Sequence, residues 1–150
     1  MTKKQDDVKS RLGSMLCFTV YSTAHAFNRA YKPLLDALGL TYPQYLAMLV
    51  LWEREGMSVS EIGQRLHLDS GTLTPLLKRL EAAGLVRRAR DAGDERQVRI
   101  ALTPKGRALH EKAKTVPHAI ACAAGEPAEA LHRLKDELVA LRDRLNASAG

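Results

Sequence analysis

The sequence predicts a mainly α-helical fold with one small β-hairpin, and three observations lead to this expectation. Apolar residues recur at spacings of three and four near both ends of the chain, over residues 12–31 and 131–145. In the middle, a short helical pattern, a tight polar turn and a longer helical pattern follow one another over residues 58–84. Two short strand-like runs, 85–90 and 97–102, then flank a polar turn.

The composition fits one globular domain over residues 1–150 with an anionic partner. The hydrophobic fraction of 45% is ordinary for a folded protein, and the formal charge of +6 at pH 7 favours a partner rich in phosphate. The polar N-terminus has no signal-peptide pattern, and the longest apolar run, 46–52, is too short to span a bilayer. We therefore expect a cytoplasmic protein that does not enter membranes, with Cys17 and Cys122 as thiols at rest.

The first third of the chain predicts three helices. Residues 12–31 present a wide, mostly apolar surface, more than a small domain normally covers on one helix. Pro33 is expected to open a short second helix, and Gly39 to cap its C-terminus. Thr41 is the expected N-cap of a third helix over residues 43–54.

The middle of the chain predicts two more helices. Ser58 and Glu61 form a capping-box pattern at the start of a short helix. Residues 67–69 make the turn to a longer helix, 70–83, which Gly84 is expected to end. The residues of the longer helix that are expected to face the core are Leu73, Leu76, Leu77 and Leu80.

The last third of the chain again predicts helices. Thr103 and Pro104 form a typical helix start, and Pro117 should interrupt that helix because its ring clashes with a preceding carbonyl and it lacks an N–H. Gly125 and Pro127 mark a break. The leucines of the last helix recur at three-four spacing, which suits pairing with another helix.

A helix, a tight turn, a second helix and a basic hairpin, in this order, form a winged helix-turn-helix. The second helix of such a unit enters the DNA major groove, so it must begin with small polar residues that allow close approach to the base edges. The side chains of the second helix expected to contact bases or phosphates are Ser70, Gly71, Thr72, Thr74, Lys78 and Arg79. The simpler alternative is that Ser70 only caps a core helix and the basic residues form a solvated surface.

Several stretches resemble the MarR family of repressors, and the resemblance extends over nearly the whole chain. These stretches are residues 73–86 (LTPLLKRLEAAGLV), the hairpin tip 91–96 (DAGDER) and residues 102–106 (LTPKG). The resemblance implies that Asp94 orients Arg96 for contact with DNA. The boundaries it implies are 41–103 for the winged helix-turn-helix, and 10–38 and 104–146 for helices that form a homodimer.

Within that family, the chain is similar to the organic hydroperoxide repressors, OhrR. The matching stretches are 16–18 (LCF), 31–35 (YKPLL), 40–46 (LTYPQYL) and 68–75 (LDSGTLTP). The similarity implies that Cys17 reacts with an organic hydroperoxide, helped by Tyr31 and Tyr42, and that this reaction releases double-stranded operator DNA. It also implies that Cys122 is the resolving cysteine of the two-cysteine branch, in which the disulfide joins opposite subunits.

The spacing of these residues restricts how they meet. Hydroxyl donors near sulfur stabilise the thiolate, which is the reactive form. Tyr31 lies 14 residues after Cys17, which is about 21 Å along one helix. If the two residues form one site, Tyr31 must come from the partner subunit. A sulfenic acid at Cys17 can be trapped by a second thiol such as Cys122, and the resulting helix shift would spoil the spacing of the two DNA-reading heads.

The same residues allow other interpretations. Cys17 can be a small buried hydrophobe, and Tyr31 and Tyr42 ordinary core residues. The repressor would then respond to a small aromatic ligand, with Cys17 incidental. A thiol peroxidase is a third possibility, although the chain lacks the peroxiredoxin motif. His118 and Cys122 share a helix face without further ligands nearby, so we expect neither a metal nor a cofactor.

Overall fold

The computed structural model describes residues 11–125 and 127–150, and the chain divides into two compact units. The first unit extends to Lys114, and the second comprises residues 115–150. The expected dimerisation segment 10–38 begins one residue outside the described range. None of the helices in the described ranges is both long and apolar enough to cross a bilayer.

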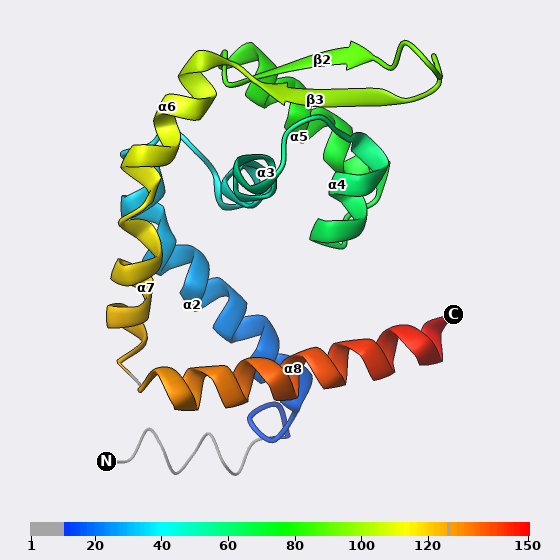
Figure 1. The fold of residues 1–150 in the computed structure, drawn as a ribbon. Coiled ribbons are helices and arrows are strands. Elements are labelled where there is room, and N and C mark those ends of the chain that lie inside the picture. The colour runs from blue at the N-terminus through cyan, green and yellow to red at the C-terminus, as the bar shows by residue number, and fades with distance from the viewer. Residues whose placement is uncertain (1–10, 126) are drawn as a thin grey trace. The chain divides into compact units, whose positions relative to one another are not determined.

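The first unit is mainly helical and contains a small antiparallel sheet (Figure 1). Its helices are α2 (Leu16–Asp36), α3 (Tyr42–Glu53), α4 (Val59–Leu66), α5 (Ser70–Ala82) and α6 (Pro104–Ala113). Its strands are β1 (Met57–Ser58), β2 (Val86–Arg90) and β3 (Val98–Leu102). The expected mainly α fold with a small hairpin is confirmed.

The sheet has the order β1-β3-β2, with β3 in the centre. Strands β2 and β3 form the predicted hairpin, in which Val86 lies opposite Leu102. Strand β1 pairs with the other edge of β3 and places Met57 opposite Ile100. The sequence does not predict β1, because a two-residue strand has no periodicity of its own and depends on a partner more than 40 residues away.

Helix α2 is continuous to its end at Asp36, with Pro33 inside it. The expected separate helix after Pro33 is therefore wrong, and the helix begins at Leu16 rather than Leu12. A proline removes one backbone hydrogen bond from a helix. The turn that contains Pro33 also buries Leu35 in the core, and this packing offsets the lost hydrogen bond.

Helix α3 begins at the predicted cap. The Thr41 side chain accepts a hydrogen bond from the Gln44 N–H, and the Gln44 side chain accepts one from the Thr41 N–H. The two exchanged bonds satisfy donors that a helix start otherwise leaves free. Gly39 does not cap a separate helix, but its φ of +69° lets the chain turn between α2 and α3.

Helix α4 has half of the predicted capping box. The Ser58 hydroxyl accepts a hydrogen bond from the Glu61 N–H at 3.2 Å. The Glu61 carboxylate does not return to the Ser58 N–H and instead lies 4.0 Å from the Arg54 guanidinium. The tertiary ion pair therefore replaces the local bond that the sequence predicts.

The core of the first unit gathers side chains from α3, α4, α5 and the sheet. Its fully buried members include Met48, Leu51, Ile62, Leu73, Leu77, Leu80 and Ile100. All four predicted α5 leucines are buried, since Leu76 is also only 7% exposed. Burial of one leucine side chain stabilises a fold by roughly 1.5–3 kcal/mol, so these contacts fix the orientation of α5.

Gly106 brings α6 close to the rest of the first unit. Its carbonyl oxygen accepts a hydrogen bond from Trp52 Nε1 at 2.9 Å, and the His110 ring stacks on the same indole. A Cβ atom on Gly106 would overlap the backbone carbonyl oxygen of Leu85. A side chain at this position is therefore excluded, and α6 packs directly beside the chain that enters β2.

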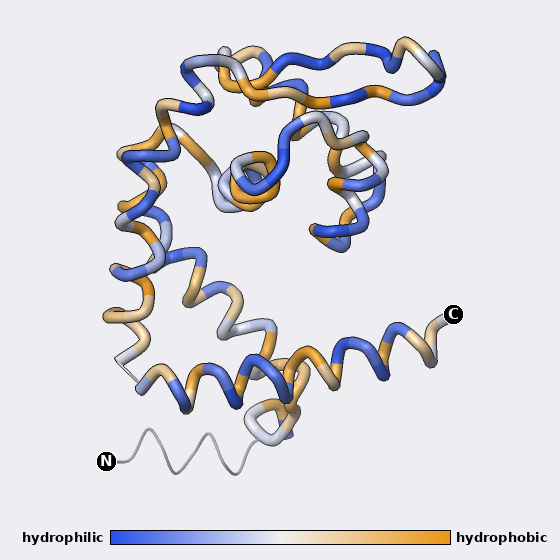
Figure 2. Tube along the Cα trace, in the orientation of Figure 1, coloured by the Kyte–Doolittle hydropathy of each residue, from blue (hydrophilic) through white to orange (hydrophobic). Residues whose placement is uncertain are grey.

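The second unit consists of α7 (Val116–Ala124) and α8 (Ala128–Ala149). Pro117 lies in the first turn of α7, which confirms the predicted interruption, and Gly125 ends that helix with a φ of +69°. Apolar and polar bands alternate along α8 (Figure 2). The most exposed apolar side chains of α8 are Leu134, Leu138 and Leu145.

Candidate functional site

The start of α5 presents small polar side chains to solvent. Ser70, Gly71 and Thr72 are all exposed, whereas Leu73 is completely buried. The helix cap is Asp69, whose carboxylate accepts a hydrogen bond from the Thr72 N–H at 2.7 Å. This bond is the main cause of the lowered pKa of Asp69. Because Asp69 supplies the cap, the Ser70 hydroxyl remains available for another partner.

The remaining α5 candidates continue along the same helix. Lys78 and Arg79 are exposed and Thr74 is half-buried. Among the described residues, neither Lys78 nor Arg79 forms an ion pair. Two cations two turns into the helix, on an exposed surface, are suited to neutralising phosphate groups of an anionic partner.

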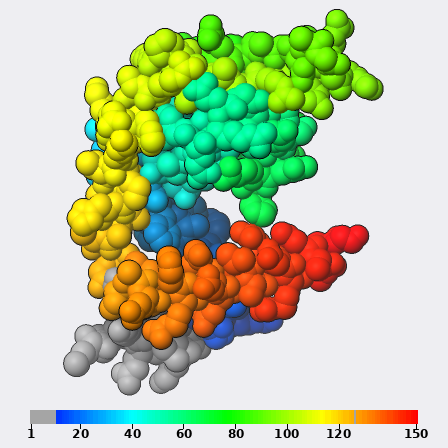
Figure 3. Space-filling model, viewed as in Figure 1, coloured from blue at the N-terminus to red at the C-terminus, as the bar shows by residue number. Residues whose placement is uncertain are grey.

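The tip of the β2–β3 hairpin carries Asp94 and Arg96. One carboxylate oxygen of Asp94 accepts hydrogen bonds from the backbone N–H and from Nε of Arg96, at 3.1 and 3.4 Å. The Arg96 side chain is nevertheless 92% exposed. The space-filling view shows the hairpin projecting beyond the helices of its unit (Figure 3). Asp94 therefore holds the Nε side of a guanidinium that otherwise lies exposed to solvent, where it can meet an anion.

Two other hairpin arginines, Arg88 and Arg99, connect the hairpin to the rest of its unit, which the sequence does not predict. Arg88 donates to the Glu81 carboxylate from both its backbone N–H and its side chain. Arg99 donates to Asp91 at 2.6 Å and to the Gly56 carbonyl at 2.8 Å. These bonds connect the hairpin to α5 and to the chain before β1. They stiffen the wing rather than extend its surface for DNA.

Tyr31 and Tyr42 come together between α2 and α3. Their ring centroids are 4.7 Å apart, and Tyr45 joins the cluster at 5.8 Å from Tyr31. Burial, with the neighbouring phenols of Tyr42 and Tyr45, raises the pKa of Tyr31 to about 12. Burial also raises the pKa of Tyr42 and of Tyr45. The phenols therefore stay protonated at neutral pH and can act as hydrogen-bond donors.

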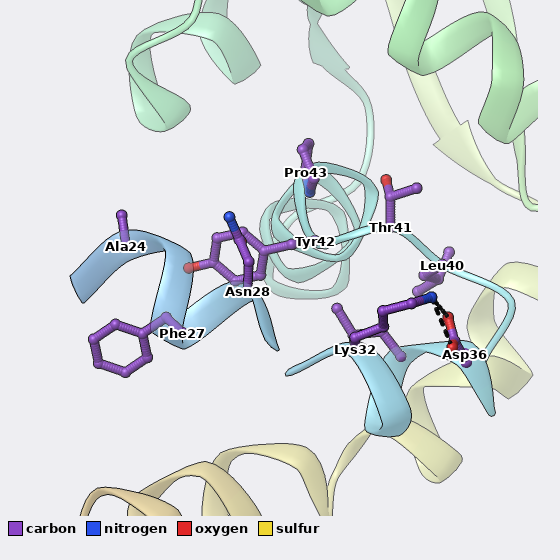
Figure 4. Close-up of a pocket in the computed structure, with 10 residues that line it drawn as sticks. Ala24, Phe27, Asn28, Lys32, Asp36, Leu40, Thr41, Tyr42 and Pro43 are labelled. Atoms are coloured by element: carbon purple, nitrogen blue, oxygen red, sulfur yellow. Dashed lines mark hydrogen bonds and ion pairs between the residues drawn. The ribbon is translucent and has the colours of Figure 1, made fainter. Parts of the chain in front are cut away.

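A pocket of about 570 Å³ opens beside this cluster. Its lining residues come from α2, from the segment that follows it and from the start of α3, and are Ala24, Phe27, Asn28, Lys32, Leu35, Asp36, Leu40, Thr41, Tyr42 and Pro43 (Figure 4). Lys32 and Asp36 form an ion pair of 3.0 Å on this wall. The pocket is within the size range of small-molecule sites, and Tyr42 gives it a hydroxyl next to an apolar lining.

Cys17 is not part of this cluster. It is the second residue of α2, and its free thiol is exposed. The continuous helix carries Tyr31 14 residues further on, which is about 21 Å along the axis. Tyr21, one turn after Cys17, instead contacts His25 edge-on at 4.4 Å. Within one chain, the structure joins the two phenols and leaves the thiol separate from them.

Cys122 lies in α7 of the second unit, also as an exposed free thiol. Its sulfur is 3.6 Å from Nε2 of His118. In the described ranges, no group of three or more His, Cys, Asp or Glu side chains could hold a metal ion.

Comparison with known proteins identifies the family. The model of the family described as "Transcriptional regulator SarA/Rot" matches residues 29–113. Over 146 residues, the chain is 47% identical to the organic hydroperoxide resistance transcriptional regulator of Bacillus subtilis, which covers 97% of this chain and 98% of that protein. The chain belongs to the MarR/SarA family of transcriptional regulators.

Two further relatives support this assignment. The regulator TtmR of Methylorubrum extorquens is 60% identical over 97% of this MarR/SarA-family chain and 74% of its own length. AbfR is a protein of Staphylococcus epidermidis whose reduced form has been solved bound to DNA. Its sequence is 36% identical to this chain, and the two structures match with a TM-score of 0.74 over 97% of this chain and 99% of that one. The predicted winged helix-turn-helix is thus confirmed, and the protein is a DNA-binding regulator rather than a thiol peroxidase.

Some features of the MarR/SarA-family site are missing from the sequence prediction, although signals for them exist. Asp69 is a good N-cap residue directly before the predicted helix. Tyr45 lies three residues after Tyr42, so both rings share one side of α3. His118 and Cys122 share a helix face, and their spacing predicts a side-chain contact as well as a pair of metal ligands.

Proposed function

We propose that the protein is a redox-responsive repressor that binds operator DNA as a homodimer and is released when an organic hydroperoxide oxidises Cys17. The observation that carries this proposal is an exposed free thiol near one end of α2 and two protonated phenols, Tyr31 of α2 and Tyr42 of α3, near its other end. A regulator of this kind acts on the chromosome, so we assign it to the cytoplasm.

The distance along α2 supports a site shared between subunits. A thiol and a phenol about 21 Å apart on one rigid helix cannot meet, but two antiparallel copies of the helix can place Cys17 of one subunit beside Tyr31 and Tyr42 of the other. The exposed apolar side chains of α2 are what a dimer interface would cover: Leu16, Val20, Tyr21 and Phe27. In such a dimer the pocket beside Tyr42 would receive the organic part of the peroxide.

The chemistry requires an anionic sulfur and a stabilised leaving group. The Cys17 thiolate attacks the outer oxygen of the hydroperoxide, so a sulfur–oxygen bond forms and the oxygen–oxygen bond breaks. The departing alkoxide takes a proton and leaves as an alcohol, and Cys17 becomes a sulfenic acid. Tyr31 and Tyr42 donate hydrogen bonds to the oxygen on which negative charge develops. Their raised pKa values keep them as donors throughout.

DNA is bound by the first turn of α5, by the two cations further along it and by the hairpin tip. The residues to which we assign DNA contact are Ser70, Gly71, Thr72, Thr74, Lys78, Arg79 and Arg96, with Asp94 orienting Arg96. The small side chains at 70–72 allow the helix to approach base edges in the major groove. Arg96, 92% exposed, is suited to the narrow minor groove or its phosphates.

Oxidation is coupled to release through the dimer. A homodimer reads two half-sites about 34 Å apart, one DNA turn, so a small rotation of either subunit spoils the fit. We assign Cys122 as the thiol that traps the Cys17 sulfenic acid as a disulfide between subunits. AbfR, the relative described above, has structures in reduced, overoxidized and disulfide-formed states, which supports thiol oxidation as the signal here.

The test uses a DNA fragment selected from random sequence by the reduced protein. One equivalent of cumene hydroperoxide is expected to raise the Kd for this fragment on the order of 100-fold, since allosteric coupling commonly amounts to 5–150-fold. Dithiothreitol should restore binding, because a disulfide is reducible. Binding that is unchanged by the hydroperoxide, with Cys17 shown by mass spectrometry to be oxidised, would contradict the proposal.

The pocket favours a second candidate function, a repressor induced by a small aromatic ligand. Phe27 and Tyr42 offer ring surfaces in a space of about 570 Å³, which suits one small aromatic acid. Salicylate would then release the selected DNA at concentrations that do not depend on Cys17. Equal release of the wild type and of Cys17→Ser by salicylate, without any effect of cumene hydroperoxide, would favour this second function.

A further inference from the structure

The thiol of Cys122 has a proton acceptor beside it on the same helix. His118 lies one turn before Cys122 on α7, and its Nε2 atom is 3.6 Å from the Cys122 sulfur. No other charged or titratable side chain belongs to α7, whose sequence is VPHAIACAA. Both side chains are exposed, so an oxidised partner thiol can reach the sulfur without unpacking a core.

The position of Cys122 on its helix makes such an acceptor useful. The residue lies in the last turn of α7, where its carbonyl oxygen accepts the Gly125 N–H at 3.2 Å. The C-terminal end of a helix carries partial negative charge, which disfavours an anion. The thiolate is nevertheless the form that attacks another sulfur, and an ordinary thiol is only a few per cent ionised at neutral pH. A neighbouring base that accepts the proton would therefore speed the attack.

We propose that His118 is the general base that ionises Cys122 for attack on oxidised Cys17. This inference rests on the function proposed above, because it takes the sulfenic acid at Cys17 as the reaction partner. Imidazole suits the role, since its ordinary pKa lies near neutral pH and it accepts and returns a proton readily. With the ring proton on Nδ1, the Nε2 lone pair faces the thiol.

The step balances without any further reagent. The Cys122 thiol gives its proton to Nε2 of His118, and its sulfur attacks the sulfur of the Cys17 sulfenic acid. The disulfide bond forms as the sulfur–oxygen bond of the sulfenic acid breaks. The departing hydroxide takes the proton from the imidazolium and leaves as water, so His118 returns to its neutral form. No electron enters or leaves, because the sulfenic acid already carries the oxidation.

The experiment compares His118→Gln with the wild type and with a matched control, His132→Gln, which removes an exposed histidine of α8. A short pulse of excess cumene hydroperoxide converts Cys17 to the sulfenic acid. Disulfide formation is then followed by quenched-flow and non-reducing gels between pH 5.5 and 9. In a Cys122→Ser background, trapping with dimedone measures the rate of sulfenic acid formation separately.

At pH 7 we expect His118→Gln to form the disulfide about 10- to 30-fold more slowly, because no neighbouring base then accepts the thiol proton during attack. The wild-type rate should depend on pH less steeply than the variant rate, because the imidazole accepts the thiol proton. The variant rate should rise with pH and approach the wild-type rate in alkaline buffer, a convergence that a merely structural defect would not give. Sulfenic acid formation at Cys17 and the His132→Gln rates should equal those of the wild type.

Two results would overturn the inference. Equal disulfide rates for His118→Gln and wild type at every pH, with normal sulfenic acid formation, would exclude His118 as the base and leave the proposed function intact. Equal slowing by His132→Gln would exclude a specific role in the same way. If no sulfenic acid forms at Cys17 in any of the proteins, the proposed function itself fails, and the inference fails with it.

Discussion

Replacing Cys17 by serine is expected to remove the response to organic hydroperoxide and leave operator binding by the reduced protein unchanged. The side chain is exposed, and serine differs from it by one atom, so neither the fold nor the DNA-reading elements should change. A serine hydroxyl forms no sulfenic acid under these conditions, so the oxidation ladder cannot begin. The wild type should lose affinity on the order of 100-fold after treatment, whereas the variant should lose none.

The measurement is fluorescence anisotropy on the selected DNA, with and without one equivalent of cumene hydroperoxide. Cys122→Ser is the matched control, because it removes the other exposed thiol and leaves the sulfenic acid step at Cys17 possible. This control should still be modified at Cys17, as mass spectrometry can show, but should form no disulfide. Release of Cys17→Ser at the same peroxide concentration as the wild type would refute Cys17 as the sensor.

Replacing Arg96 by alanine should weaken operator binding about 5- to 150-fold, the range expected for loss of one well-placed DNA contact of about 1–3 kcal/mol. The slope of log Kd against log salt should also fall by about one, because one phosphate contact is lost. The stability of the fold should not change measurably, since the Arg96 side chain is 92% exposed and a surface ion pair contributes about 0–1 kcal/mol.

Gln97→Ala is the control for Arg96→Ala, because Gln97 is an exposed, uncharged residue of the same hairpin. It should bind the selected DNA within twofold of the wild type. Urea unfolding of both variants separates a lost contact from a disordered wing. An Arg96→Ala protein with wild-type affinity and an unchanged salt slope would remove the hairpin tip from the DNA interface.

Local signals in the sequence predict much of the fold. Thr41 and Ser58 cap the helices that they are expected to cap, because a hydroxyl and an N–H three residues later need no tertiary partner. Pro117 interrupts the helical segment as predicted, because a proline lacks the N–H that a helix interior needs, whatever its tertiary surroundings. The inward leucines of α5 follow from the helical period alone.

Features that depend on distant contacts are not predictable in this way. Strand β1 exists because β3 pairs with it, and α2 continues past Pro33 because Leu35 is buried in the core. The hairpin is basic in sequence, but its Arg99 is held within the unit by Asp91. Charge patterns show that a surface is basic but do not show which of its cations already have partners.

The candidate redox site was predictable in its residues and only partly in its geometry. The spacing of Cys17 and Tyr31 on one helix predicts their separation, and the continuous α2 has that spacing. The contact between Tyr31 and Tyr42 depends on how α3 packs on α2, which no local pattern specifies. The arrangement across two subunits follows from these facts only if the dimer forms through α2.

The central claim, that each site combines Cys17 of one subunit with the phenols of the other, is tested most directly with mixed dimers. One subunit carries Cys17→Ser, its partner carries Tyr31→Phe and Tyr42→Phe, both carry Cys122→Ser, and two affinity tags isolate the heterodimer. A single Cys17 then remains, and stopped-flow trapping measures its rate of sulfenic acid formation. The reciprocal control joins an otherwise wild-type subunit to one that carries Cys17→Ser and both phenylalanine substitutions.

We predict that the first heterodimer reacts at the wild-type rate per thiol, because its Cys17 meets the intact tyrosines of the partner. The reciprocal heterodimer should react about 100-fold more slowly, the usual cost of losing a hydrogen-bond donor to a developing oxyanion. The opposite order, a slow first heterodimer and a fast reciprocal one, would place thiol and phenols in the same subunit and contradict the account.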